Sequence, residues 1–121
     1  AFEEKDREYR FAPSGFAGLE TALGVVLTAL YHTGEVGLSE IIASFTVNPA
    51  RILGLDAGAL AVGKDADITI FDPDYSWTVD SSSFYTRGKY TPFEGKELKG
   101  KAVGTIVKGK QVMVNGEVVS E

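Results

Sequence analysis

The sequence predicts an α/β protein whose helices come first and whose antiparallel strands follow. Apolar residues recur at three- and four-residue spacing from Gly18 to Thr33, as they do along the buried face of a helix. The stretch "DADITIF" (65–71) instead places Ala66, Ile68 and Ile70 on one side, which is the period of a strand. Because the two patterns are segregated along the chain, they indicate two structural units, residues 1–54 and residues 55–121.

The first unit should hold two amphipathic helices before its last, shorter one. The apolar stripe of the first helix comprises Leu19, Ala22, Leu23, Val26, Leu27, Leu30 and Tyr31. Gly34 is expected to end this helix. In the second helix, Ser39 is the expected N-cap, and Ile41, Ile42 and Phe45 form the expected buried side.

The stretch "TVNPARILGL" (46–55) predicts a third, short helix with clear start and stop signals. Asn48 can cap the helix through its side-chain oxygen, and Pro49 suits the first helical position, where no N–H is needed. Gly54 supplies a left-handed residue at the helix end.

Strands and turns are expected after residue 55. "DPD" (72–74) should end the first strand as a turn, and "YSWTV" (75–79) is a candidate for the next strand. Strand-like runs in "GTIVKGKQVMVNGEVV" (104–119) are broken at Lys108-Gly109 and at Asn115-Gly116, and the second break predicts a two-residue hairpin. Residues 81–100 have little periodicity and should form an irregular excursion.

Composition excludes several classes of function. The formal net charge of −5 argues against a nucleic-acid partner, since affinity for phosphates needs clustered Lys and Arg. The sequence has no cysteine, which excludes disulfides and thiolate chemistry. No apolar stretch approaches the ~20 residues that span a bilayer, and the charged N-terminus does not look like a signal peptide. We therefore expect a cytoplasmic protein without membrane contact.

The residues by themselves provide no catalytic machinery. His32 is the only histidine, and its place just before the expected helix stop favours a structural role over metal binding. Ser14 lies in "PSGFAG" (13–18), which is not the G-x-S-x-G pattern of a nucleophilic serine, and no second histidine exists to activate it. Asp72 and Asp74 flank a proline, as in a turn, so we do not expect them to act as an acid/base pair.

Four stretches, however, resemble the C-terminal end of bacterial-type dihydroorotases, which are metal-dependent cyclic-amide hydrolases of the amidohydrolase superfamily. The stretches are "FAPSGFAGLETAL" (11–23), "TVNPARILGL" (46–55), "GALAVGKDADITIFDPD" (58–74) followed by Trp77, and "TPFEGKELKGKAVGTIVKGKQV" (91–112). The second and third resemble the superfamily in general, including hydantoinases and allantoinases. "APSGFAGLE" and "TPFEG" resemble dihydroorotases in particular. The family more often has an aromatic residue at the position of Ser14 and an asparagine at that of Tyr90.

The resemblance implies a fold that explains why neither unit looks complete. Residues 1–54 would be the terminal loop and helices of a (β/α)₈ TIM barrel, and residues 55–121 would be the C-terminal half of a small antiparallel β-sandwich. It also implies a parent enzyme that uses zinc to cyclise N-carbamoyl-L-aspartate reversibly to L-dihydroorotate in pyrimidine biosynthesis. The zinc ligands and catalytic groups would precede residue 1, so this chain alone should be inactive and should hold no metal.

The same resemblance assigns substrate binding to Pro13, Ser14 and Gly15, because a loop at the C-terminal end of a barrel strand faces the active site. Gly15 would allow close backbone approach to the ring of dihydroorotate or N-carbamoyl-aspartate. The simpler alternative is that these residues only turn the chain into the first helix. A homodimer or a complex with aspartate transcarbamoylase is also implied. Two other functions stay open: a non-catalytic scaffold for that partner, and a hydantoinase or allantoinase relative.

Overall fold

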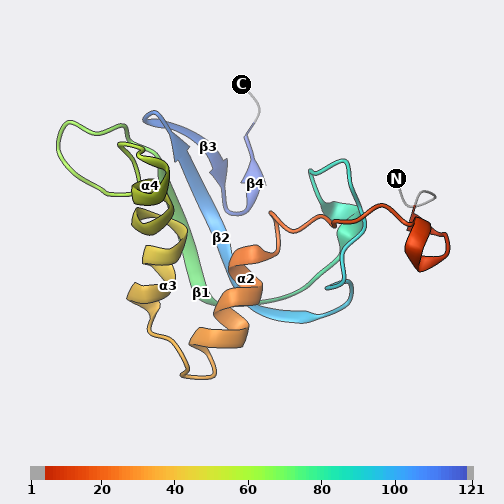
Figure 1. Ribbon diagram of the computed structural model, residues 1–121. Helices are drawn as coiled ribbons and strands as arrows, with labels where there is room; N and C mark the ends of the chain where they lie inside the picture. The colour runs from red at the N-terminus through yellow and green to blue at the C-terminus, as the bar shows by residue number, and fades with distance from the viewer. Residues whose placement is uncertain (1–4, 120–121) are drawn as a thin grey trace.

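Figure 1 shows a computed structural model of the chain, which describes residues 5–119. The outer ends of the two predicted units, residues 1–4 and 120–121, lie outside the described residues. The helices are α2 (Ala22–Val26), α3 (Leu38–Phe45) and α4 (Val47–Leu53). The strands are β1 (Ile68–Thr78), β2 (Glu97–Val107), β3 (Lys110–Val114) and β4 (Glu117–Val118). The predicted α/β class, with helices preceding an antiparallel sheet, is therefore confirmed.

The first helix starts later than predicted, and of the predicted stripe only Leu27 is fully buried. It begins at Ala22 and continues through a π-helical turn, Leu27–Tyr31, before Gly34 adopts a φ of 79°. Leu19 lies outside the helix and is 89% exposed, so its assignment to the buried stripe was wrong. The residues turned fully inward are Thr21, Gly24 and Leu27. Small side chains occupy this face because the backbone of β2 comes close to it.

Two glycines allow α2 to lie directly against β2. A Cβ atom on Gly24 would lie 2.9 Å from the carbonyl oxygen of Gly100 and 3.2 Å from Trp77. A Cβ on Gly100 would lie 2.4 Å from Leu27 Cδ1, and the φ of Gly100 is +114°, which side chains rarely adopt. The indole Nε1 of Trp77 donates a hydrogen bond to the Gly100 carbonyl at 2.9 Å. We call this contact of Gly24, Leu27, Trp77 and Gly100 the helix–sheet junction.

Helix α3 differs from the prediction at its start and on its buried side. Its N-cap is Gly37, which places Ser39 inside the helix. Ile41 is buried, whereas Ile42 and Phe45 are 40% and 44% exposed. Among the described residues, α3 contacts α4 and the π-helical turn.

Helix α4 ends where the sequence predicts, but the predicted N-cap does not form. Thr46 is the N-cap, and no side chain caps the helix, so Asn48 does not have the capping role expected of it. Pro49 lies in the first turn, where its missing N–H costs no helical hydrogen bond. Gly54 ends the helix in the left-handed region, with φ 66° and ψ 30°.

Strand β1 runs through the Asp-Pro-Asp stretch instead of ending there. The β1–β2 register shifts between Asp72 and Ser76, so a bulge interrupts the ladder opposite Gly100. The Asp74 N–H donates to Asp72 Oδ1 at 2.9 Å, a local turn contact that lies inside the strand. The prediction of a strand end was therefore wrong, and residues 75–78 extend the same strand.

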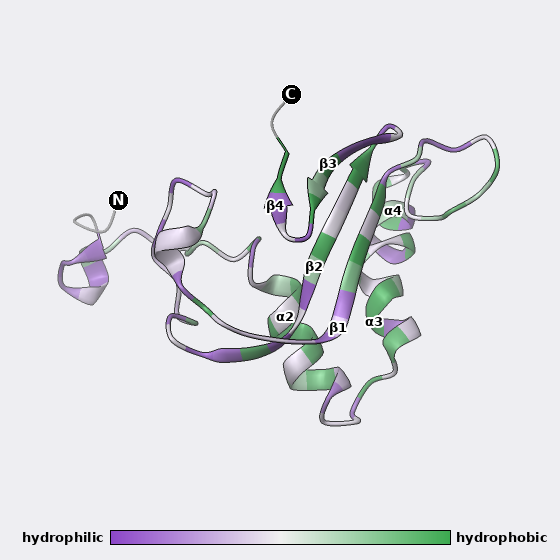
Figure 2. Cartoon of the chain, turned by 180° about the vertical axis from the view of Figure 1, so that it is seen from behind, coloured by the Kyte–Doolittle hydropathy of each residue, from purple (hydrophilic) through white to green (hydrophobic). Residues whose placement is uncertain are grey.

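The four strands form a meander in the order β1-β2-β3-β4. The hairpin predicted at Asn115-Gly116 is confirmed, with φ angles of 50° and 82°. The predicted break at Lys108-Gly109 is also a hairpin, with φ angles of 48° and 80°. The predicted irregular excursion ends earlier than expected, because residues 97–100 already belong to β2. Figures 1 and 2, which view the chain from opposite sides, show α2, α3 and α4 gathered on one face of the sheet.

Candidate functional site

The predicted substrate-binding residues Pro13, Ser14 and Gly15 lie in an exposed loop that precedes α2. Residues 13–17 form one wall of an open hollow of about 360 Å³, and residues 86 and 88–90 form the opposite wall. The Ala17 N–H donates to the Tyr90 carbonyl at 2.8 Å and so ties the two walls together. The volume falls within the ~300–1,000 Å³ that ligand pockets occupy. We call this hollow the loop hollow.

The loop takes its shape from its sequence and from one aromatic contact. Pro13 restricts its own φ, and Gly15 adopts a φ of +89° in open surroundings, where a Cβ atom would meet nothing within 4 Å. The ring of Phe16 packs edge-on against Phe93, with 6.0 Å between centroids. Phe93 in turn packs against the cluster of Val79, Phe84 and Leu98. The "TPFEG" stretch thus anchors the loop through apolar packing.

Ser14 lines the loop hollow, and its polar groups have no partner among the described residues. Among residues 5–119, no hydrogen bond engages the Ser14 N–H, its carbonyl or its hydroxyl. The carbonyls on either side of it, those of Pro13 and Gly15, both accept hydrogen bonds from the Lys5 ammonium. The loop therefore offers neutral donors and acceptors at Ser14, which is the chemistry that pairs with an amide-bearing ring.

Glu20 holds the opposite wall of the loop hollow. Its carboxylate accepts hydrogen bonds from the Tyr85 N–H at 3.1 Å, the Thr86 N–H at 2.9 Å and the Thr86 hydroxyl. Burial alone would raise the pKa of Glu20, but the hydrogen bonds from Thr86 and Tyr85 and the charge of Lys89 together lower it. Sequence reasoning missed both Lys5 and Glu20, because their partners lie in other segments of the chain.

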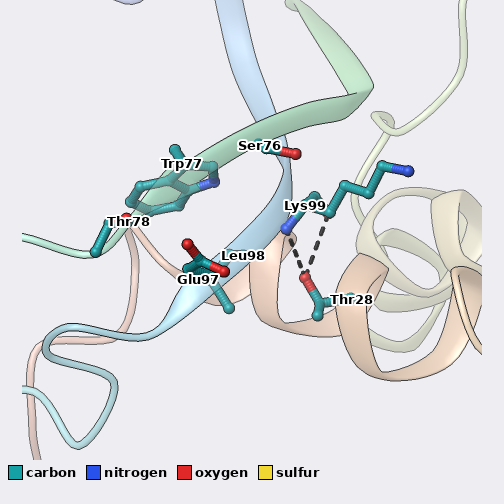
Figure 3. Close-up of a pocket in the computed structure, with 7 residues that line it drawn as sticks. All are labelled: Thr28, Ser76, Trp77, Thr78, Glu97, Leu98 and Lys99. Carbon is teal, nitrogen blue, oxygen red and sulfur yellow. Dashed lines mark hydrogen bonds between the residues drawn. The ribbon is translucent and has the colours of Figure 1, made fainter.

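A second hollow, of about 310 Å³, lies between Thr28 of the π-helical turn, the last residues of β1 and the first residues of β2, away from the predicted residues (Figure 3). The Thr28 hydroxyl accepts a hydrogen bond from the Lys99 N–H at 2.8 Å and donates to the Gly24 carbonyl at 2.7 Å. Lys99 also pairs with Asp74 across 3.6 Å. The Thr28 hydroxyl thus joins the helix to the backbone of β2 beside the bulge, so we interpret this hollow as part of the helix–sheet junction.

No metal centre is formed by the described residues. Within residues 5–119, no three His, Cys, Asp or Glu side chains converge as metal ligands would. His32 lies at the C-cap of the π-helical turn, and its Nε2 is 2.7 Å from the Pro73 carbonyl oxygen. This contact joins the helix end to the bulge of β1. The side chains of residues 5–119 therefore do not provide a set of ligands that fits zinc.

None of the helices in the described part of the chain is long and apolar enough to cross a membrane. This finding agrees with the hydropathy of the sequence.

Comparison with known proteins places the chain in a family. The model of the amidohydrolase family matches residues 14–112, and the chain belongs to that family. It is 50% identical over 111 residues to a dihydroorotase of Pelotomaculum thermopropionicum, a match that covers 92% of this chain and 26% of that protein. A dihydroorotase of Clostridium acetobutylicum is 47% identical over 110 residues, covering 91% and 26%. The resemblance to dihydroorotases is therefore confirmed.

Solved structures of the same class share the fold. An L-hydantoinase (dihydropyrimidinase) from Arthrobacter aurescens has a TM-score of 0.85 at 38% identity, covering 93% of this chain and 25% of that one. A D-hydantoinase from Thermus sp. has a TM-score of 0.88 at 27% identity, covering 98% and 27%. The chain spans about a quarter of the length of the relatives it matches.

Proposed function

We propose that this chain is the C-terminal portion of a dihydroorotase that converts N-carbamoyl-L-aspartate reversibly to L-dihydroorotate in pyrimidine biosynthesis. We call the longer polypeptide the parent enzyme. Identity of 50% and 47% to two dihydroorotases over nine-tenths of the chain supports this assignment. The zinc ions and the proton-transferring groups would belong to the remainder of the parent enzyme.

Within the parent enzyme, residues 1–54 would form the last part of the TIM barrel and residues 55–121 part of a β-sandwich. Two features support the second assignment. Strands β1 and β4 are the edges of the described sheet, and each pairs with only one described strand. In addition, the sheet face opposite the helices carries no helix of residues 5–119 (Figure 2). Further strands of the parent enzyme could pair with such an edge or pack on this face.

The role of this segment would be to bind and orient the substrate through Pro13, Ser14 and Gly15. The observation that carries this proposal is that Ser14 lines the loop hollow and that its peptide groups have no hydrogen-bond partner in the described chain. The dihydroorotate ring contains amide N–H and C=O groups that complement them. Holding the ring in one orientation would lower the entropy cost of reaction at a neighbouring centre.

A Gly15→Val substitution in the parent enzyme tests the binding role. Valine at a φ of +89° is strained, and the loop should change shape, although no neighbour within 4 Å would clash. We expect KM for dihydroorotate to rise about 10-fold, with a smaller change in kcat. The control is Gly37→Ala, since Gly37 has a φ of −69° and equally open surroundings. An unchanged KM in the valine variant would refute the binding role.

A hydantoinase is the second candidate, because the two structural matches above are hydantoinases. Kinetics of the parent enzyme on dihydroorotate, hydantoin and allantoin separate the candidates. We expect the highest kcat/KM with dihydroorotate, and preference for another ring would reject the first proposal.

Other features of the parent enzyme stay predictions. The isolated chain should neither turn over dihydroorotate nor bind zinc stoichiometrically, and robust turnover would reject the assignment of catalysis to the remainder. Size-exclusion chromatography with and without aspartate transcarbamoylase would test for a homodimer and for that complex. Cell fractionation would test the cytoplasmic location.

A further inference from the structure

The side chain of Lys5 connects both walls of the loop hollow. Its ammonium donates hydrogen bonds to the carbonyls of Pro13 and Gly15, which flank Ser14. It also lies over the ring of Tyr90, 5.5 Å from the centroid, on the opposite wall. A single cation thus contacts three groups from two segments that are distant in the sequence.

These contacts have a consequence for the loop. Two carbonyl oxygens that converge on one point repel each other, and a cation between them removes that repulsion. Charge-assisted hydrogen bonds are also stronger than neutral ones. Because Lys5 engages the Pro13 and Gly15 carbonyls, it holds the peptide units on both sides of Ser14 in one orientation, and the Ser14 peptide groups have no hydrogen-bond partner within residues 5–119. Lys5 therefore selects the loop conformation that the proposed binding role requires.

The contact with Tyr90 sets the width of the hollow. A cation over an aromatic face is attracted to it, with a strength of roughly 0.5–1 kcal/mol at exposed sites. The hydrogen bond from the Ala17 N–H to the Tyr90 carbonyl joins the same two walls at 2.8 Å. Lys5 and Ala17 together hold the loop and residue 90 at a fixed separation.

We propose that Lys5 is a positioning residue that holds the substrate-facing loop in its binding conformation. The proposal rests on the proposed function and deepens it, because Lys5 acts through the loop and not on the reacting atoms.

The experiment uses the parent enzyme and four variants: Lys5→Met, Lys5→Gln, Lys5→Arg and Lys96→Met. Methionine keeps the length of the side chain and removes the charge, whereas arginine keeps a cation with several donors. Lys96 is an exposed lysine outside the loop hollow, so its substitution controls for loss of one surface charge. We expect Lys5→Met to raise KM for dihydroorotate about 10-fold with kcat within about 3-fold. Lys5→Arg should restore KM to within about 3-fold, and Lys96→Met should change neither constant.

Hydrogen exchange of the ligand-free enzyme gives a readout that is independent of turnover. The amide of Ala17, which donates to the Tyr90 carbonyl, should exchange faster in Lys5→Met than in the wild type, while the melting temperature stays the same. If Lys5→Met fails to fold, Lys5→Gln takes its place. An unchanged KM in a folded neutral variant overturns the positioning role, whatever the exchange shows.

The Gly15→Val variant keeps this outcome separate from the proposed function. A raised KM in Gly15→Val with an unchanged KM in Lys5→Met rejects only the role of Lys5. An unchanged KM in both variants rejects substrate binding by the loop as well.

Discussion

The helix–sheet junction and the loop hollow are held together in different ways. At the junction, Leu27 is fully buried, and an added Cβ atom on either Gly24 or Gly100 would overlap a neighbour. Around the loop hollow, an added Cβ on Gly15 would meet nothing within 4 Å. The two walls are joined by the hydrogen bond from the Ala17 N–H to the Tyr90 carbonyl and by the contact of the Lys5 ammonium with the Tyr90 ring, and Glu20 holds Thr86 by hydrogen bonds. The junction depends on close packing, and the hollow depends on a few polar contacts.

This difference predicts which part of the chain tolerates amino-acid substitutions. At a packed contact, a change in side-chain volume lowers the stability of the fold. An exposed polar contact contributes little to global stability, but it fixes a local conformation. Substitutions at the junction should therefore unfold the protein without a specific effect on substrate binding. Substitutions around the hollow should alter the loop while the rest of the fold stays intact.

The largest effect is expected for Gly100→Val. The substitution combines a clash with Leu27 and a strained φ of +114°, and we expect it to lower the free energy of unfolding by about 4 kcal/mol. Urea unfolding of the parent enzyme measures the change, with Gly37→Ala as the control. A midpoint equal to that of the wild type would show that α2 does not lie against β2.

Leu27→Ala should come next. Removing a fully buried leucine side chain leaves a cavity and costs about 3 kcal/mol. Leu27→Met conserves the volume and should cost less than ~1.5 kcal/mol. Unfolding midpoints of the two variants test the packing, and equal midpoints would contradict it.

Thr28→Val should have a smaller effect at the same junction. Valine keeps the shape of threonine but leaves the Lys99 N–H without its acceptor, at a cost of about 1.5 kcal/mol. Thr28→Ser retains the hydroxyl and controls for the lost hydrogen bond. If Thr28→Val unfolds like the wild type and Thr28→Ser is destabilised, then the hydrogen bond contributes nothing and only the methyl group matters.

The smallest effect on global stability is expected for Glu20→Gln, at the loop hollow. Burial would raise the pKa of Glu20, but the hydrogen bonds from Thr86 and Tyr85 outweigh it, so the pKa in the folded chain lies below its ordinary value of 4.5. The contribution of Glu20 is therefore fully present above pH 4.5 and is lost as the pH falls through the lower, folded pKa.

Hydrogen exchange of residues 84–88 between pH 7 and pH 3 tests this prediction. At pH 7 the amides of residues 84–88 should exchange more slowly in the wild type than in Glu20→Gln. This difference in exchange rate should disappear as the pH falls to 3. Glu97→Gln, at an exposed carboxylate outside this contact, is the control. A difference that persists unchanged to pH 3 would contradict a role for the charge.

Local chemistry made several features predictable from the sequence. Lys108-Gly109 and Asn115-Gly116 specify tight hairpins because their backbone angles favour glycine and asparagine. Gly54 ends α4 for the same reason. The four family stretches also identified the class of protein from the residues alone, since each of them matches a pattern typical of that class.

Contacts between distant segments could not be predicted in the same way. Asp72-Pro73-Asp74 has the composition of a turn, yet pairing with β2 extends β1 through it as a bulge. Leu19 fits a helical stripe, yet α2 buries Gly24 because the backbone of β2 lies there. Likewise, nothing in the residues around Lys5 and Glu20 indicates their partners.

The sequence by itself determined the order of helices and strands, the hairpins and the family, because turn angles, periodicity and motif residues are local properties. Only the tertiary structure decided which glycines face a neighbouring backbone and which charges hold the loop beside Ser14. Those choices depend on distances between segments far apart in the chain, and such distances are fixed only when the elements pack.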